Sequence, residues 1–146
     1  RVAVKRGTVT GAAVDVPVFA AQPAVFTLDG ARAILVRSDS NTLVTAASPM
    51  QPLENLYLYA TGLGPVENQP PTGSATQAAP LAQARTLPSI TIGGVTCLVR
   101  FAGLAPGLAG VYQVNLVVPP GIASGEQDLV LTLAGAAAPV VKAFAR

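Results

Sequence analysis

The stretch between Gly103 and Gly125 constrains the fold of this chain more than any other part of the sequence. Between two turns rich in glycine and proline it holds one alternating run. Tyr112, Val114, Leu116 and Val118 face one way, and Gln113, Asn115 and Val117 face the other. Alternation with a period of two between turn signals is typical of a half-buried antiparallel strand. We therefore predict a β-strand with one buried face over residues 112–118.

Similar short runs recur along the chain, each bounded by turn residues. No segment of a dozen residues keeps a helical period without glycine or proline, so no helix is expected. The predicted strands cover residues 2–6, 14–18, 24–27, 33–37, 43–45, 55–61, 89–92, 95–101, 112–118, 127–133 and 140–145. Asn55–Thr61 carries large groups on both faces, which favours the middle of a sheet. The pair Gly93-Gly94 separates two alternating runs and predicts a tight hairpin.

The spacing of these strands predicts an all-β fold, an Ig-like antiparallel β-sandwich of about eight to ten short strands. A closed barrel is the alternative, but the uneven strand lengths favour two packed sheets. Residues 1–19 and 128–146 are alike, since each has two short strands joined by a Gly/Ala turn. We expect residues 1–22 to be a hairpin that ends an upstream module or serves as a strand-exchange arm. Residues 23–146 then form the sandwich.

Composition excludes several classes of function. Charged residues make up 11% of the 146 residues, the net charge is +2, and the basic residues are scattered rather than clustered. Nucleic-acid binding needs a concentrated basic patch, so no nucleic-acid partner is expected. No apolar run approaches the ~20 residues of a membrane-spanning helix. The chain opens on Arg1 without a signal-like segment, and we expect it to be part of something longer.

The residue types that most enzymes use are missing or poorly placed. The chain has no histidine, which removes Ser-His-Asp and Cys-His catalysis and the commonest metal ligand. Glu126 and Asp128 share one face of a predicted strand, but a glycosidase needs two carboxylates that converge across a sugar. The adjacent turn favours a solvated edge for this pair. We therefore predict no enzyme, no catalytic residues and no cofactor.

Two further positions have a structural and a functional interpretation. Cys97 is the single cysteine, so no intrachain disulfide can form, and its alternation with Val95 and Val99 predicts a buried residue rather than a reactive thiol. Asp39 lies in the oxygen-rich run 38–41, where calcium is one interpretation. A turn held by side-chain hydrogen bonds explains the same residues with a single carboxylate, and no metal site is predicted.

Sugar-binding sandwiches usually present exposed aromatic platforms, and this chain has no tryptophan and 5% aromatic residues. Tyr57, Tyr59 and Tyr112 lie within predicted strands, which favours packing in the core or between sheets. The segment Val66–Leu87 is the longest irregular one, expected as a solvated connection, with a ligand site as the alternative. Gly62 and Gly64 are expected as turn residues, since no helix follows them to form a phosphate loop.

Four pieces of sequence carry a family resemblance. They are PAVFT (23–27), LYATGLGP (58–65), APL (79–81) and SITIGGVTCLVRFAGLAPGLAGVYQVNLVVPPGIASG (89–125). In this order they resemble the Solibacter-type uncharacterised C-terminal domain, found at the ends of long secreted proteins of acidobacteria and related soil bacteria. Family members more often have Pro-Gly-Ile-Phe-Thr at the first piece, and residues 29–52 depart from the family's Asn/Asp-Gly-rich pattern. The resemblance implies a secreted or surface-exposed Ig-like β domain without established catalytic residues.

Together these features predict a non-catalytic structural or adhesive module, located outside the cell or on its surface. Its expected partners are other copies of itself or neighbouring β modules of the same polypeptide. In a sharper form of this hypothesis, residues 1–20 polymerise subunits by β-strand addition. The alternative is a carbohydrate- or ligand-binding accessory module, with residues 66–87 as the site and a surface glycan as the partner. A weaker alternative is an enzyme that uses Glu126 and Asp128 alone.

Overall fold

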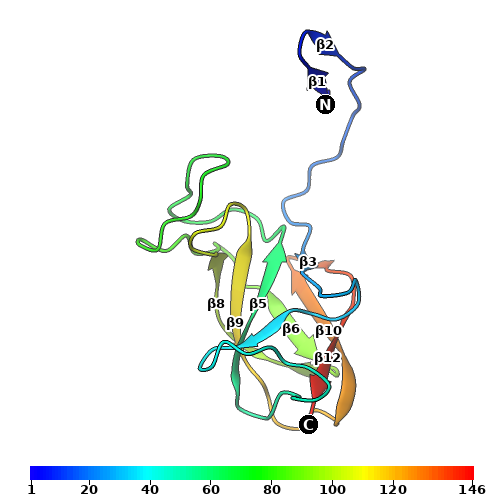
Figure 1. Ribbon diagram of the computed structural model, residues 1–146, viewed down its shortest axis with the longest axis vertical. Helices are drawn as coiled ribbons and strands as arrows, with labels where there is room; N and C mark the ends of the chain where they lie inside the picture. Colours follow the sequence, from blue (N-terminus) through cyan, green and yellow to red (C-terminus); the bar gives the residue numbers. More distant parts are fainter.

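Alternating apolar residues form strands throughout the chain, and the computed structural model, which describes residues 1–146, contains no helix (Figure 1). It has twelve strands: β1 (Lys5–Arg6), β2 (Val9–Thr10), β3 (Ala24–Val25), β4 (Leu35–Arg37), β5 (Asn55–Thr61), β6 (Ser89–Ile92), β7 (Val95–Thr96), β8 (Leu98–Leu104), β9 (Tyr112–Val117), β10 (Gly125–Leu133), β11 (Ala136–Ala137) and β12 (Val141–Ala145). The predicted all-β class is therefore confirmed.

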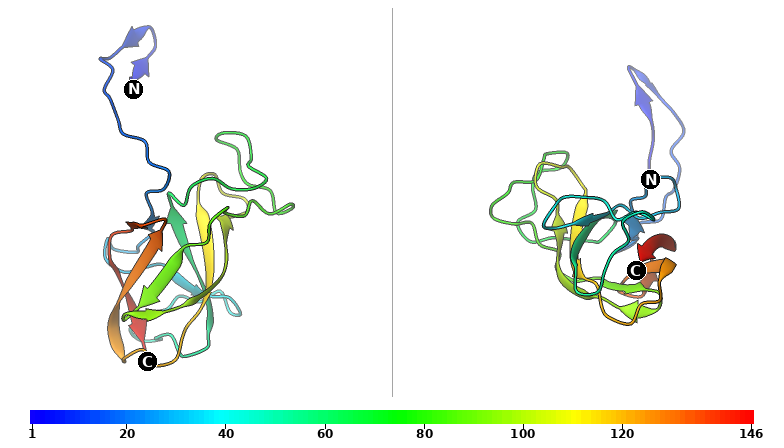
Figure 2. Two further views of the ribbon diagram at one scale, coloured as in Figure 1. Left: turned by 180° about the vertical axis from the view of Figure 1, so that it is seen from behind. Right: turned by 60° about the horizontal axis from the view of Figure 1, so that its bottom comes forward.

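Ten of these strands form two five-stranded antiparallel sheets that pack against each other (Figure 2). In the first, called the β5 sheet, β3 and β4 pair with one edge of β5, and β9 and then β8 follow on the other side. In the second, called the β10 sheet, β11 and β12 pair with β10, followed by β6 and then β7. This architecture is a β-sandwich. Its Ig-like assignment stays a prediction.

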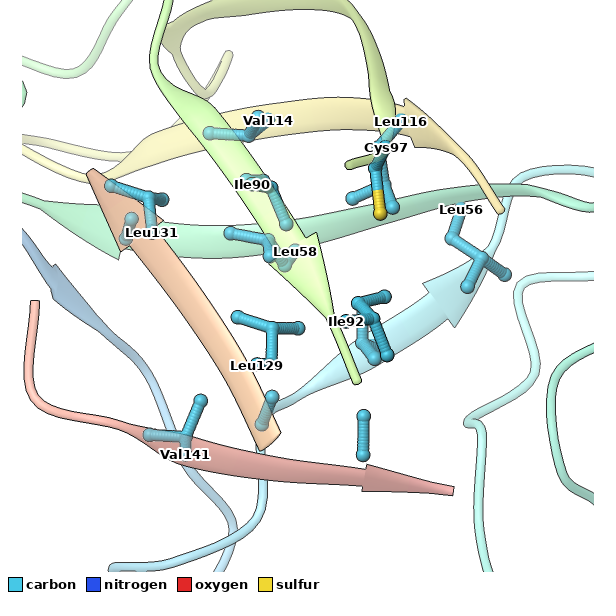
Figure 3. Packing of buried hydrophobic residues seen from close by; sticks show 14 of the residues in the cluster. Leu56, Leu58, Ile90, Ile92, Cys97, Val114, Leu116, Leu129, Leu131 and Val141 are labelled. Atoms are coloured by element: carbon cyan, nitrogen blue, oxygen red, sulfur yellow. The ribbon is translucent and has the colours of Figure 1, made fainter. Parts of the chain in front are cut away.

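One core of 23 buried residues lies between the sheets (Figure 3). The predicted face of β9 supplies Val114 and Leu116, and Val118 follows directly after the strand, all with at most 2% of their surface exposed. From the facing sheet, Leu129 and Leu131 of β10 are fully buried. Burying such side chains is worth about 1.5–3 kcal/mol each before the loss of chain entropy is counted. The alternation seen in the sequence thus sets which face of each sheet is internal.

The predicted hairpin at Gly93-Gly94 is confirmed, and it joins β6 to β7. Both glycines have positive φ angles, of 57° and 78°, as a type I′ turn requires. The prediction of one strand over 95–101 is wrong, because the chain leaves the β10 sheet after β7 and enters the β5 sheet as β8. The crossing occurs at Cys97, whose N–H donates to the carbonyl of Ile90 over 2.8 Å. Continuous alternation in the sequence cannot reveal such a change of sheet.

The first twenty residues are all exposed and extend away from the sandwich (Figures 1 and 2). The predicted strands 2–6 and 14–18 are only partly correct, because β1 pairs with β2 across a turn at Gly7, and Val2 forms a single bridge with Val14. The Gly/Ala turn expected between these two runs begins at Gly7, but β2 follows it at once. Gly7 has a φ of 60°, which lets the chain reverse early. No strand forms at 15–19, where Pro17 lacks an N–H for pairing.

Most sheet edges are covered by other segments of the chain. The outer edge of β12 bonds to residues 31–33 and to Met50, and the second half of β8 bonds to residues 82–84. Leu43 pairs back with Val36 next to β4, but through a single bridge, so the predicted strand 43–45 does not form. By contrast, the run 95–101 pairs only with β6 and β9 and has an open side. This run therefore includes an open edge of each sheet, β7 before the crossing at Cys97 and the first residues of β8 after it.

Arg37, at the end of β4, has a structural role that its scattered position in the sequence did not indicate. Its side chain is only 12% exposed. The guanidinium donates to the backbone carbonyls of Leu43, Ser48 and Pro49 over 3.0–3.1 Å, and its Nε lies 3.2 Å from Oε1 of Glu54. Arg37 therefore holds the long connection between β4 and β5 against the sandwich.

Candidate functional surfaces

Glu126 and Asp128 lie on one face of β10, as the sequence predicted, and both are exposed to solvent. Each lies beside a different cation: Asp128 Oδ1 lies 2.5 Å from Nζ of Lys142, and Glu126 Oε1 lies 3.4 Å from Nε of Arg32, which also pairs with Asp29 at 2.6 Å. The hydrogen bond and charge of Asp128 raise the pKa of Lys142 above its usual value. The two carboxylates thus form ion pairs with Lys142 of β12 and with Arg32, and neither carboxylate lines the hollows described below.

Beside this charged face, a hollow separates β12 from the connection after β4. Leu28, Leu35 and Val44 contribute apolar surface to it, and Lys142 and Arg32 also line it. The guanidinium carbon of Arg32 lies 5.6 Å from the centre of the Phe144 ring, within the range of a cation–π contact. Sequence reasoning missed this hollow because its walls come from segments far apart in the chain.

Cys97 is buried, with 5% of its surface exposed, which confirms the prediction of a structural residue. Burial raises the pKa of its thiol to about 11, so the reactive thiolate is scarce at neutral pH. Its predicted place inside a strand is wrong, because it occupies the crossing between the two sheets. There it packs within the main core, while Val95 and Val99 are only half-buried.

The predicted core packing of Tyr57 and Tyr59 is wrong. Both lie half-buried on the outer face of the β5 sheet, because Leu56, Leu58 and Ala60 of the same strand take the inner positions. Their rings meet edge to face at 5.7 Å and 76°. Burial, and then the neighbouring phenol, raise the pKa of Tyr57. In the sequence, leucine and tyrosine both qualified as apolar, so the strand did not reveal which face is internal.

Tyr112 does pack against the core, as predicted, and it also contacts the small second cluster of Val66, Ala82 and Leu104. Its hydroxyl donates a hydrogen bond to the carbonyl of Gly64. Burial raises the pKa of Tyr112 above its usual value. Tyr112 therefore has a structural role, and its hydroxyl is hydrogen-bonded.

The segment around Asp39 forms a turn, with the Asn41 N–H donating to the Arg37 carbonyl over 3.0 Å. Ser40 Oγ and Thr42 Oγ1 form a hydrogen bond of 2.9 Å. These contacts fit the turn interpretation of the sequence. No three histidine, cysteine, aspartate or glutamate side chains of the chain lie close enough together to hold a metal ion.

Residues 66–87 form an irregular excursion at one end of the sandwich (Figure 1). The segment is tied down at several points: Val66 bridges Ala84, and the hydroxyl of the buried Thr76 donates to the Leu108 carbonyl over 3.0 Å. It encloses a polar hollow whose lining includes Asn68, Ser74 and Gln77. Gly62 and Gly64, just before it, have positive φ angles and act as turn residues.

The exposed N-terminal segment is unusually apolar. Its large hydrophobic side chains are between 50% and 93% exposed: Val2, Val4, Val9, Val14, Val16, Val18 and Phe19. Its ion pair, between Arg1 and Asp15 at 2.9 Å, lies within the segment itself. A contiguous run of this kind is a candidate interaction surface.

Comparisons with known proteins do not assign this chain to a family. No family model, no curated protein and no solved structure matches the chain. The resemblance to the Solibacter-type domain therefore stays a prediction. None of the elements is a helix with the length and apolar character needed to cross a bilayer.

Proposed function

We propose that this chain is a non-catalytic structural or adhesive β-sandwich module that works outside the cell or on its surface. In this proposal, residues 1–19 attach it to a second copy by adding a strand to that copy's sheet. The observation that carries the proposal is the exposure of seven large apolar side chains in the N-terminal segment, none of which covers the sandwich of its own chain. The extracellular location rests on the family resemblance alone.

The N-terminal segment has the properties of a donor strand. A hairpin with two residues in each strand is at best marginally stable by itself in water, so pairing with a partner would add order to this segment. Val14, Val16 and Val18 alternate with Asp15 and Pro17, so their side chains would lie on one face of an added strand. Val14, Val16 and Val18 would supply the main-chain hydrogen bonds, because the nitrogen of Pro17, which has no N–H, would face away from the acceptor. Their side chains would supply the apolar contact.

The sandwich offers an acceptor along residues 95–101, where β7 of the β10 sheet and the first residues of β8 of the β5 sheet each have an open edge. Here β7 pairs only with β6, and the first residues of β8 pair only with β9. Leu98 is 57% exposed on this edge. Open edges with apolar side chains are the usual sites of strand addition, and lysine placed on an edge opposes it.

The possible chemical centres support a non-catalytic role. Glu126 and Asp128 are each engaged with a cation on an exposed face, and Cys97 is buried with a raised pKa. A nucleophile or acid–base pair would instead need accessible groups with matched geometry.

Sedimentation over a range of protein concentrations tests the proposal. The full chain should form dimers or longer assemblies, while a variant lacking residues 1–19 and the variant Leu98→Lys should stay monomeric. Val140→Lys is the matched control, because Val140 is also exposed (56%) but lies outside the proposed edge. A full chain that stays monomeric at every concentration, or a truncated chain that assembles equally well, would refute the proposal.

A further inference from the structure

We propose a second site, a binding surface for neutral glycans on the outer face of the β5 sheet. It is formed by Tyr57, Tyr59, Phe101, Gln113 and Asn115, here called the tyrosine–amide face. The site does not depend on strand addition. It differs from the ligand site expected at residues 66–87, because four of its five residues come from the two central strands β5 and β9.

The strand register sets the arrangement of these side chains. Asn115 pairs with Tyr57 on one side and with Phe101 on the other, which gives a row across three strands. Neighbouring strands lie about 4.8 Å apart, so the row spans about 10 Å between the backbones of its two aromatic residues. In the next row, Gln113 pairs with Tyr59 on one side and with Gly103 on the other. Because Gly103 has no side chain, it leaves space for the Phe101 ring: a Cβ atom added at Gly103 would lie 2.7 Å from that ring. Aromatic rings thus flank two carboxamides.

The two carboxamides are held in place and still have free polar atoms. Nε2 of Gln113 donates to Oδ1 of Asn115 over 2.8 Å, which fixes the two side chains relative to each other. The remaining acceptor, Oε1 of Gln113, and the remaining donor group, Nδ2 of Asn115, have no hydrogen-bond partner in the protein. A hydroxyl pair on adjacent sugar carbons supplies both a donor and an acceptor. The face therefore presents complementary groups at a defined separation.

The surface around this pair is shallow and open along one direction. One hollow is lined by Phe101, Gln113 and Asn115 together with Leu81 and Pro106. A second hollow begins at Asn115 and continues past Asn55 towards Arg100 and Asp39. Because Asn115 lines both, an extended ligand could follow the face from one hollow into the other.

The chemistry of the face favours an uncharged, hydroxyl-rich ligand. The outward residues of β5 and β9 are Asn55, Tyr57, Tyr59, Thr61, Gln113, Asn115 and Val117, and none is charged. Nucleic acids and anionic membranes need clustered cations, which this face lacks. The centre of a protein interface is mainly apolar, whereas here rings alternate with amides. Rings that stack on the C–H faces of sugars, with a few fixed polar groups, match a glycan.

Two binding assays test the site. Gel electrophoresis is run in the presence of soluble β-glucan, xylan or galactomannan, and the protein is sedimented with insoluble cellulose or chitin. At least one of these five polysaccharides should retain the full-length protein. Tyr59→Ala and Asn115→Ala should each weaken retention about tenfold, the loss expected for one stacking or paired polar contact. Tyr59→Phe, which keeps the ring, should bind almost as well as the parent chain. Thermal unfolding of each variant shows that the sandwich is intact.

Phe19→Ala is the control, because it removes an aromatic ring that is even more exposed (61%) but lies in the N-terminal segment, away from the tyrosine–amide face. It should bind the polysaccharide as the parent chain does. Asn115→Ala, in turn, should leave the sedimentation behaviour of the protein unchanged, which separates this site from the proposed assembly. Failure of all five polysaccharides to retain the protein, or unchanged retention by folded Tyr59→Ala and Asn115→Ala, would overturn the inference.

Discussion

The hydroxyl of Tyr112, the first residue of β9, donates a hydrogen bond to the backbone carbonyl of Gly64, in the turn that follows β5. Tyr112 also contacts both hydrophobic clusters. One side chain thus connects the central strands of the β5 sheet to the start of the irregular segment 66–87. This hydrogen bond holds the start of the segment against the sandwich.

Replacing Tyr112 by phenylalanine should therefore lower the free energy of unfolding. The Gly64 carbonyl loses its partner in a half-buried position, at an expected cost of about 1–2 kcal/mol. Urea denaturation measures the change. Tyr59→Phe is the control, since its hydroxyl lies on the outer face, and it should change stability by less than about 0.5 kcal/mol. Equal effects of the two substitutions would show that the Gly64 contact contributes nothing.

Gly62→Ala should be more damaging than other glycine substitutions. Gly62 has a φ of 72°, and an added Cβ would lie 1.9 Å from the carbonyl oxygen of Gln22. Gly73→Ala is a matched control, because Gly73 has a φ of 78° but no atom within 4 Å of the added Cβ. The control should cost about 1–2 kcal/mol from backbone strain alone. Gly62→Ala should lose clearly more in the same denaturation experiment, because the segment leading to β3 must move.

Arg37→Lys should destabilise the sandwich although it keeps the charge. A lysine cannot reach three carbonyls and the Glu54 carboxylate at once, because it lacks the planar fork of the guanidinium. We expect a loss of about 2 kcal/mol or more in the free energy of unfolding. Arg32→Lys, at a side chain that is 48% exposed, should cost less than about 1 kcal/mol. Similar losses at both positions would contradict the structural role of Arg37.

Cys97 should resist thiol reagents until the protein unfolds. Its burial and its pKa of about 11 keep the thiol protonated and covered at pH 8. Because this pKa lies above that of the unfolded chain, the protonated thiol favours the folded state below pH 9, and the contribution is lost as the pH rises towards 11. Labelling with a maleimide, followed by mass spectrometry with and without denaturant, checks this. Rapid labelling of the native protein would contradict it.

The sequence supported strong predictions wherever one periodic pattern had one structural meaning. The alternation in β9, the central place of β5 and the turn at Gly93-Gly94 all follow from local rules, and the structure confirms them. The change of sheet at Cys97 could not be predicted, because alternation continues on both sides of it. The early reversal at Gly7 was missed for a related reason, since both arrangements alternate.

The candidate sites depended more on three-dimensional context. Tyr57 and Tyr59 were assigned to the core because local alternation alone cannot rank tyrosine against leucine for the inner face. Gln113 and Asn115 were correctly placed opposite the buried residues of their strand, but their aromatic neighbours come from β5 and β8 through pairing. Arg37 looked like a scattered surface charge until its carbonyl partners, which lie 6 to 12 residues away, came together.

Hydrogen–deuterium exchange of the full chain at low and high protein concentration tests the proposed strand addition most directly. At high concentration, the amides of Val14, Val16 and Val18 and of the edge 95–101 should become protected, because each segment supplies main-chain partners to the other; Pro17 has no amide N–H. At low concentration, residues 1–19 should exchange at the rate of an unpaired chain. Fast exchange of residues 1–19 at every concentration, with no change along 95–101, would contradict the account.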